Sequence, residues 1–316
     1  MSLLSGSTVV VTGAGGYVGR RLCSELVGRG ARVRALVRND SDYPLPIGVD
    51  CLVVGDIARI NDWRPFLAGA QSVVHLAGVS TTRHVDDLRE FRRVNVEPTK
   101  LLVAQCAEIK IQRFVYLSSI KVLGESSGDR PFSNSTGTNP QSAYGCSKHE
   151  AEQEVVDGSQ RSQMEFVILR PAMVYGTPPT GNIKRLIKLV GAGLPLPFGG
   201  INNSRSWVSV EGLCEVICGS LYRPELAGLK LLVADPRPLS TPQTVDLIAR
   251  ALGKNALLIP VPVKMLRAVG RLVGRSAEIS RLVSSLEVDA TQTFEYFEWK
   301  PEWCFEESVD DLCAAK

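Results

Sequence analysis

Tyr144 and Lys148 are the two residues of this chain whose types and spacing most directly suggest chemistry. They stand four positions apart in the run Tyr144-Gly145-Cys146-Ser147-Lys148, and in a helix that spacing places both side chains on one face, one turn apart. A free tyrosine has a pKa of about 10 and is a poor proton shuttle at neutral pH. Because a nearby positive charge favours the phenolate, with ~1.4 kcal/mol for each unit of pKa shift, the pair is predicted to move a proton.

A glycine-rich turn is the second informative pattern. A β-branched apolar run leads into glycines and then into an amphipathic stretch over 20–30, beginning Val9-Val10-Val11-Thr12-Gly13-Ala14-Gly15-Gly16-Tyr17-Val18-Gly19. This order predicts a strand, a tight turn and a helix whose N-terminus offers free N–H groups and a positive dipole end to a pyrophosphate. By itself the run also fits an ordinary turn. Together with the tyrosine–lysine pair and Ser118-Ser119, it indicates a dinucleotide-binding enzyme.

Composition sets bounds on the class of protein. The 316 residues are 44% hydrophobic and 22% charged, as in an ordinary soluble enzyme, and a formal net charge of +3 is too small to indicate nucleic-acid binding. No apolar stretch approaches the roughly 18 residues of a membrane span, and residues 1–7 lack signal-peptide features. The eight cysteines are scattered, without metal-ligand spacing to the histidines. We expect a reduced, cytoplasmic protein without a metal and without a nucleic-acid or membrane partner.

Strand-like and helix-like stretches alternate through the first half of the chain. Strands are predicted at 9–11, 33–37, 51–54, 72–76, 114–117 and 165–169, and helices from 17, over 91–109 and over 144–156. The alternation predicts an α/β fold, a Rossmann-type doubly wound parallel sheet whose strands are apolar because both faces are covered.

The character of the sequence changes after Arg170-Pro171, where proline and glycine cluster and predict loops. A helix over 208–222 and a strand over 229–233 are predicted to return to the main sheet. The predicted division is a dinucleotide-binding domain over 1–170 plus about 205–236, and a smaller, mainly C-terminal substrate-binding domain over about 171–204 and 237–316.

Five motifs resemble those of the extended short-chain dehydrogenases/reductases, in the nucleotide-sugar epimerase/dehydratase branch. They are Thr12-Gly13-x-x-Gly16-x-x-Gly19, Gly55-Asp56-Ile57, Val74-His75-Leu76-Ala77-Gly78, Tyr116-Leu117-Ser118-Ser119-Ile120-Lys121-Val122-Leu123-Gly124 and Arg170-Pro171-Ala172-Met173-Val174-Tyr175-Gly176. Leu123 stands where the family usually has tyrosine, and Pro98 where it usually has glycine. Near Pro98, Asn95 is expected to brace the loops beside the site, and His75 is expected to be a packed strand residue.

The resemblance implies an NAD(P)-dependent oxidoreductase or epimerase with Ser119, Tyr144 and Lys148 as catalytic residues. Ser119, rather than its neighbour Ser118, would hydrogen-bond the reacting oxygen, and Lys148 would also hold the nicotinamide ribose. Cofactor binding is implied for Gly13, Gly16, Tyr17, Val18, Gly19, Arg38, Asp56, Ile57, Leu76, Ala77, Gly78, Tyr144, Lys148, Pro171 and Met173.

The end of the second predicted strand bears on the choice of cofactor. NAD enzymes of this type place an Asp or Glu there for the ribose hydroxyls, whereas this chain has Val37 followed by Arg38, with no carboxylate before Asp40. An arginine pairs bidentately with a 2′-phosphate. NADP(H) is therefore the expected cofactor, and NAD(H) is the alternative, in which Arg38 only stacks on the adenine.

The downstream pattern over 182–210 resembles the nucleotide-diphosphosugar clamp of the family. It implies a UDP-sugar substrate, a homodimer, and substrate contacts from Ser119, Asn182, Leu196, Phe198, Arg205 and Arg281. The asparagine and the two arginines would hold the diphosphate, because guanidinium groups suit phosphate. The leucine and phenylalanine would line the uracil.

Several functions share these residues. The favoured reading is NADPH-dependent reduction of a UDP-4-keto-6-deoxy (amino)hexose at C4, in the biosynthesis of surface polysaccharide. The alternative is a UDP-glucose or UDP-N-acetylglucosamine 4-epimerase with tightly bound NAD. A 4,6-dehydratase is disfavoured because Ser119 is followed by Ile120-Lys121 rather than Asp-Glu. A non-catalytic NADP-sensing regulator is disfavoured because Tyr144 and Lys148 are both present.

Overall fold

Buried valines begin the central sheet. In a computed structural model, which describes residues 3–39, 45–80 and 87–315, β1 (Thr8–Thr12) carries Val9, Val10 and Val11, all fully buried. β-Branched side chains favour strands, and burial on both faces is typical of a central parallel strand. The apolar run before the glycine turn is therefore the core strand that the sequence predicts.

Seven strands form one sheet in the order β3-β2-β1-β4-β5-β6-β9, and the pairs from β3 to β6 are all parallel. The strand order reverses between β1 and β4, the place where doubly wound sheets bind ligands. The predicted α/β doubly wound fold is confirmed. After β1, the strands are β2 (Arg32–Val37), β3 (Val49–Val53), β4 (Ser72–His75), β5 (Arg113–Leu117), β6 (Glu165–Pro171) and β9 (Lys230–Val233).

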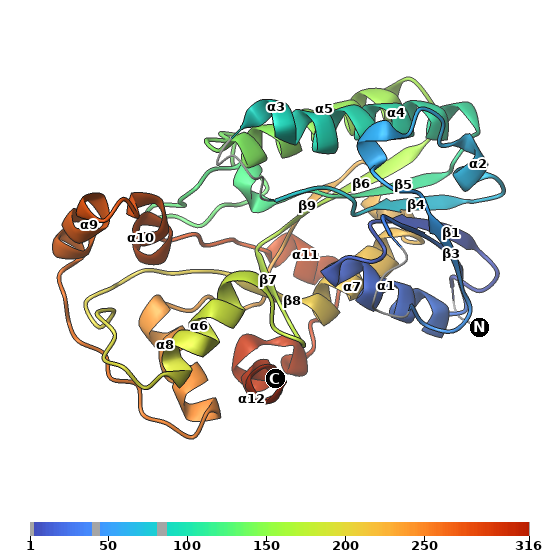
Figure 1. The fold of residues 1–316 in the computed structure, drawn as a ribbon. Coiled ribbons are helices and arrows are strands. Elements are labelled where there is room, and N and C mark those ends of the chain that lie inside the picture. Colours follow the sequence, from blue (N-terminus) through green and yellow to red (C-terminus); the bar gives the residue numbers. More distant parts are fainter. Residues whose placement is uncertain (1–2, 40–44, 81–86, 316) are drawn as a thin grey trace. The chain divides into compact units, whose positions relative to one another are not determined.

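Helices cover both faces of this sheet (Figure 1). The helix over residues 17–28 buries Leu22, Cys23 and Leu26 at helical spacing and packs on β1 and β2. One face carries α3 (Leu88–Phe91), α4 (Glu97–Glu108) and α5 (Ala143–Gln160), and the other carries α1 (Tyr17–Gly28) and α7 (Val210–Ser220). A short helix, α2 (Arg64–Leu67), follows β3 in the chain.

The helix predicted over 91–109 contains an irregular turn. A π-helical turn over Arg92–Val96 joins α3 directly to α4, so the predicted helical stretch is confirmed, with a local π turn that its spacing does not predict. Pro98 lies in the first turn of α4, the part of a helix that tolerates a residue without a backbone N–H. Single π turns occur often at functional sites, and this one contains Asn95.

The chain packs as two units. Unit 1 consists of Met1–Gly124, Gly137–Pro171 and Leu213–Leu231, and unit 2 of Glu125–Thr136, Ala172–Gly212 and Leu232–Lys316. Each unit is a set of residues that contact one another more than they contact the other unit. The predicted boundaries of a dinucleotide-binding and a substrate-binding domain stay a prediction.

Unit 2 combines a small sheet with six helices among its described residues. Its strands β7 (Met173–Tyr175) and β8 (Trp207–Ser209) are parallel. Because residues 207–209 pair with β7, the helix predicted from 208 begins at 210 instead. The helices are α6 (Gly181–Gly191), α8 (Thr241–Ala251), α9 (Val263–Leu272), α10 (Ser276–Val283), α11 (Thr291–Tyr296) and α12 (Phe305–Ala314). In neither unit is a described helix long and apolar enough to cross a membrane.

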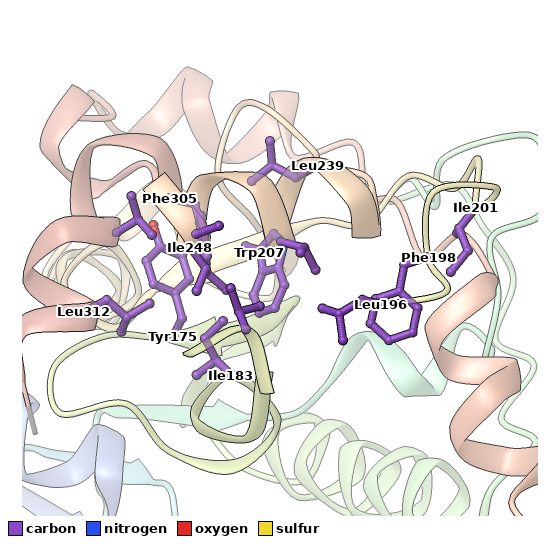
Figure 2. Close-up of a cluster of buried hydrophobic side chains, with 14 of the residues drawn as sticks. Tyr175, Ile183, Leu196, Phe198, Ile201, Trp207, Leu239, Ile248, Phe305 and Leu312 are labelled. Carbon is purple, nitrogen blue, oxygen red and sulfur yellow. The ribbon is translucent and has the colours of Figure 1, made fainter. Parts of the chain in front are cut away.

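An aromatic group lies in the core of unit 2 (Figure 2). The rings of Tyr175 and Trp207 pack on Phe305, with centroid distances of 5.0 and 5.2 Å to that residue. The Tyr175 hydroxyl contacts the Asp235 carboxylate at 2.8 Å and the backbone carbonyl of Trp303 at 2.5 Å. Its buried polar end is thus satisfied, as a core tyrosine requires.

Candidate active site

A cavity of about 480 Å³ opens at the carboxyl ends of β1, β2, β3 and β4 in unit 1. This is the topological switch point of the sheet. The predicted cofactor residues that line it are Gly13, Gly16, Arg38, Asp56, Ile57, Leu76, Ala77 and Gly78. Of the other predicted cofactor residues, three begin α1 (Tyr17, Val18 and Gly19), while Pro171 ends β6 and Met173 begins β7.

Glycine is required at two positions of the turn. Gly13 has a φ of +69°, and a Cβ there would lie 2.7 Å from the backbone nitrogen of Ala77. A Cβ on Gly19 would lie 2.3 Å from the carbonyl oxygen of Gly13. These distances are shorter than a side chain permits, so the turn brings the β1 end, the β4 end and the start of α1 together only with glycine.

The N-terminus of α1 faces the same turn without a side-chain cap. Gly16 is the N-cap residue and makes no side-chain hydrogen bond, so the first N–H groups of this helix of 12 residues are not satisfied by a capping side chain. The backbone N–H groups at a helix N-terminus and the positive end of the helix dipole favour an anion. The residues present therefore fit the pyrophosphate of a dinucleotide.

Asp56 and Arg38 line the cavity and form an ion pair. Burial acts to raise the pKa of Asp56, but hydrogen bonds from the Ala58 N–H and from Arg93 outweigh it and lower the pKa, so the carboxylate is ionised at neutral pH. The Arg38 guanidinium is 3.9 Å from Asp56, and 65% of its side chain is exposed. It is accessible to a bound group. Asp40, the next carboxylate in the chain, lies outside the described residues.

Ser119 and Tyr144 are brought together in unit 1. Ser119 follows β5 and is the N-cap residue of a 3-10 turn over Ile120–Val122. Tyr144 lies in the first turn of α5. Burial raises the pKa of Tyr144 to about 12, against a hydrogen bond from Ser119 that lowers it. These side chains alone therefore hold the phenol neutral. The lowered pKa of Tyr144 depends on the charges of Lys148 and of an oxidised nicotinamide together, and it stays a prediction.

Lys148 is buried one turn further along α5. Burial lowers its pKa to about 7, and the charge of Glu152 opposes that shift. Its Nζ lies 4.4 Å from the ring centroid of Tyr116, a cation–π distance. The Tyr116 hydroxyl is buried and has no hydrogen-bond partner among the described residues. The ammonium group thus lies over an aromatic face, and the nearby charge of Glu152 favours its protonated form.

A buried ion pair between Arg170 and Glu152 lies one helical turn beyond this lysine, and the sequence analysis does not predict it. Arg170 donates two hydrogen bonds to Glu152, at 2.9 and 2.6 Å, and Ser118 donates a third at 2.5 Å. The Glu152 side chain is fully buried. Its position four residues after Lys148, on the same helix face, is the signal in the sequence that could have found it. The Ser118 hydroxyl therefore hydrogen-bonds Glu152 of this pair, whereas the Ser119 hydroxyl hydrogen-bonds Tyr144.

Asn95 ties α5 to the loop after β4. Its amide nitrogen donates to the Val79 carbonyl and to Ser147, both at 3.0 Å, and its amide oxygen accepts from the Val79 N–H at 2.8 Å. The expected bracing role agrees with this geometry. His75 is buried between the hydroxyls of Thr12 and Thr99, at 2.6 and 2.8 Å. Burial lowers its pKa to about 3, so it is a neutral packed strand residue, as expected.

Apart from Ser119, the predicted sugar-binding residues lie in unit 2. Arg205 is partly buried, and desolvation lowers the pKa of its guanidinium to about 10. It donates to the backbone carbonyls of Arg281 and Ser284 at the end of α10, at 2.5 and 2.9 Å. Arg281 and Asn182 are both exposed, the latter in the first turn of α6. Leu196 and Phe198 belong to the core cluster of Figure 2, so their role at a uracil stays a prediction.

Ser119→Ala tests which serine serves the reacting oxygen. Turnover should fall by roughly 10²–10³-fold, the scale of one lost donor to a developing charge, because Ser119 contacts Tyr144 directly. Ser118→Ala is the matched control, since its hydroxyl contacts Glu152 instead. Steady-state kcat of the two variants decides the matter. A larger loss in Ser118→Ala would show that the assignment is shifted by one residue.

Comparisons with known proteins find similarity to sugar-nucleotide epimerases. The model of the "NAD dependent epimerase/dehydratase family" matches residues 9–228. A "UDP-glucose 4-epimerase" of Vibrio cholerae is 34% identical over 98% of this chain and 95% of its own length. Two solved structures share the fold. A UDP-glucuronic acid 4-epimerase from Bacillus cereus in complex with NAD has a TM-score of 0.77 at 19% identity, covering 97% of this chain and 98% of that one. A UDP-glucose 4-epimerase with UDP-glucose from Thermotoga maritima has a TM-score of 0.79 at 18% identity, covering 98% of both chains.

Proposed function

Because this chain belongs to the NAD-dependent epimerase/dehydratase family, an enzyme family of the extended short-chain dehydrogenase class, we propose that it is a UDP-hexose 4-epimerase. The observation that carries the proposal is the contact between the buried phenol of Tyr144 and the Ser119 hydroxyl, one helical turn from a buried lysine. The name of the V. cholerae relative supports the epimerase over the reductase.

The proposed roles follow from the positions of the groups. As the phenolate, Tyr144 would take the proton from the 4-hydroxyl of the sugar, and as the phenol it would return that proton after the 4-keto sugar has rotated. Ser119 donates a hydrogen bond to the same oxygen, and the positive charge of Lys148 would stabilise the Tyr144 phenolate before it accepts the proton. A bound NAD would take up hydride from C4, give it back to the other face of the sugar ring, and carry a positive charge while oxidised.

The cavity residues of unit 1 would hold that cofactor. The first turn of α1 after Gly16 would bind the pyrophosphate through backbone N–H groups. Asp56 is ionised and accepts hydrogen bonds, which suits the amino group of an adenine. Lys148 would bind the ribose hydroxyls beside the nicotinamide.

The substrate residues are proposed from their places in the sequence pattern over 182–210 and at Arg281. The diphosphate of the UDP-sugar would be bound by Asn182, Arg205 and Arg281, and the uracil would be lined by Leu196 and Phe198. The Arg205 guanidinium donates to the backbone carbonyls of Arg281 and Ser284, and its Nη2 lies 3.4 Å from the Met173 sulfur. A diphosphate would have to compete with those carbonyls for the guanidinium. We further propose that the protein works as a homodimer.

One observation favours a second function, NADPH-dependent reduction of a UDP-4-keto-6-deoxyhexose at C4. Strand β2 ends at Val37 without a carboxylate, and the exposed Arg38 lines the cavity. An acidic residue at this point would bind the ribose hydroxyls of NAD, whereas an arginine suits a 2′-phosphate. An exchangeable NADPH is what a reductase needs, while an epimerase recycles a bound NAD.

The two functions predict opposite results in one pair of assays. The purified protein is mixed with UDP-glucose or UDP-N-acetylglucosamine without added cofactor, and separately with a UDP-4-keto-6-deoxyhexosamine plus NADPH or NADH. As an epimerase, it should interconvert each UDP-sugar with its C4 epimer and show no net change in nicotinamide absorbance.

Stoichiometric oxidation of NADPH with the keto sugar, and no epimerisation, would overturn the epimerase in favour of the reductase. Tyr144→Phe is the control in both assays, because either reaction requires the same proton transfer. If NADH were strongly preferred in the keto-sugar assay, the argument from Arg38 would be wrong whichever reaction is catalysed.

A further inference from the structure

Helix α9 presents three chemically distinct faces. Leu266 and Gly270 are buried and face its neighbour α10, where a Cβ on Gly270 would lie 2.8 Å from the Ile279 side chain. The two helices lie side by side in Figure 1. This packing accounts for only one side of α9. The remaining two sides are exposed.

The second face of α9 is an exposed apolar stripe. Met265, Val269 and Leu272 follow one another at intervals of four and three residues, which places them on one side of the helix. Their exposed fractions are 59%, 54% and 86%, and Val273, just after the helix, is 61% exposed. Scattered exposed apolar residues are common, but a contiguous stripe on one helix marks an interaction surface.

The third face of α9 is cationic. Lys264, Arg267 and Arg271 are all exposed, and their helical spacing places them on a side that neither faces α10 nor carries the apolar stripe. No ion pair to these three is found among the residues that the structure describes. Residues 263–283 contain five Lys or Arg and one Glu, a net charge of +4, whereas the whole chain has a net charge of +3. The rest of the chain therefore sums to −1 by difference.

We propose that α9 docks on an anionic lipid surface. An amphipathic helix with apolar residues on one side and Lys or Arg on another lies in the plane of a membrane interface, with the apolar side among the acyl chains and the basic side at the headgroups. Negative headgroups complement the local charge of this segment. A second copy of the chain fits less well, because it would bring a like charge of +4 against the first.

Peripheral docking of this kind needs no membrane-spanning helix, and it is independent of the reaction proposed above. It replaces the expectation of no membrane partner that the average composition suggests. The net charge of the whole chain does not reveal this segment, because the positive charge is concentrated in the 21 residues 263–283 and the rest of the chain is nearly neutral. The apolar stripe is likewise too short and too interrupted to register as a membrane span.

The test is co-sedimentation of the purified full-length protein with vesicles. Vesicles of equal parts phosphatidylglycerol and phosphatidylcholine should bind it, and vesicles of phosphatidylcholine alone should bind it at least about tenfold more weakly, with binding reduced by salt. Replacing Met265, Val269 and Leu272 together by serine should weaken binding by about tenfold or more. Replacing Lys264, Arg267 and Arg271 by glutamine should weaken binding to the anionic vesicles by about tenfold or more.

Ile47→Ser is the matched control, because Ile47 is 99% exposed in unit 1 and its loss should leave vesicle binding unchanged. Thermal unfolding of each variant shows that the fold is retained. Equal binding to both kinds of vesicle, or unchanged binding after the serine replacements, would overturn the proposal. So would a change in oligomeric state on light scattering without any vesicle binding, which would assign the stripe to self-association.

Discussion

Tyr144→Phe should reduce turnover by about 10²–10⁴-fold, the contribution typical of a positioned proton-transfer group, while the fold and cofactor binding persist. The phenol is the group in contact with Ser119, and the substitution removes its hydroxyl alone. The ring stays and keeps its packing on Phe91, whose centroid lies 5.8 Å away. The loss should therefore appear in kcat rather than in the stability of the protein.

Tyr116→Phe is the matched control. Tyr116 is also a buried tyrosine beside Lys148, but its hydroxyl has no partner among the described residues, and its contact with the lysine is made by the ring. Removing that hydroxyl should leave turnover within a few fold of the parent. Single-turnover rates and the affinity for NAD, measured for both variants, separate chemistry from binding. Near-normal turnover of Tyr144→Phe would remove Tyr144 from the mechanism.

The parts of the site that the sequence predicts best are those whose chemistry depends on local spacing. The turn from Gly13 to Gly19 follows from a strand, glycines and a helix in direct succession, and the structure requires glycine at both ends of it. Tyr144 and Lys148 share a helix, so their common side is set by their spacing. The order of strands and helices is similarly local, and the doubly wound sheet follows from it.

The parts that the sequence does not predict depend on contacts between distant segments. Arg170 contacts Glu152 only because β6 packs beside β5 and against α5, and the spacing of Glu152 from Lys148 gives no sign that Arg170 is its partner. The rise in the pKa of Tyr144 is another case, because spacing suggests help from a lysine but not the cost of burying the phenol. Arg205 resembles a diphosphate ligand in the sequence, yet it also satisfies carbonyls at the end of α10. A strand–helix alternation likewise could not show the π turn over Arg92–Val96.

Glu152→Ala should destabilise the protein by about 3–5 kcal/mol, because it leaves the Arg170 guanidinium buried without its partner. The pair is almost wholly removed from solvent, with side-chain exposures of 5% for Arg170 and 0% for Glu152. Its strength in the intact protein is a separate quantity, since burial of both charges opposes their attraction. The large expected effect is the cost of one orphaned charge, measured as the loss in free energy of unfolding.

Glu150→Ala on the same helix provides the control. Glu150 pairs with Arg92 at 2.6 Å, an equally short contact, but the two side chains are 32% and 49% exposed. An exposed pair contributes about 0–1 kcal/mol, so this variant should unfold almost like the parent. Replacing Glu152 and Arg170 together by methionine should recover much of the stability, because no charge is then left buried. Equal losses in Glu152→Ala and Glu150→Ala would show that burial does not set the cost. A double variant no more stable than Glu152→Ala would show that the lost packing and the Ser118 hydrogen bond, rather than the orphaned guanidinium, account for the destabilisation.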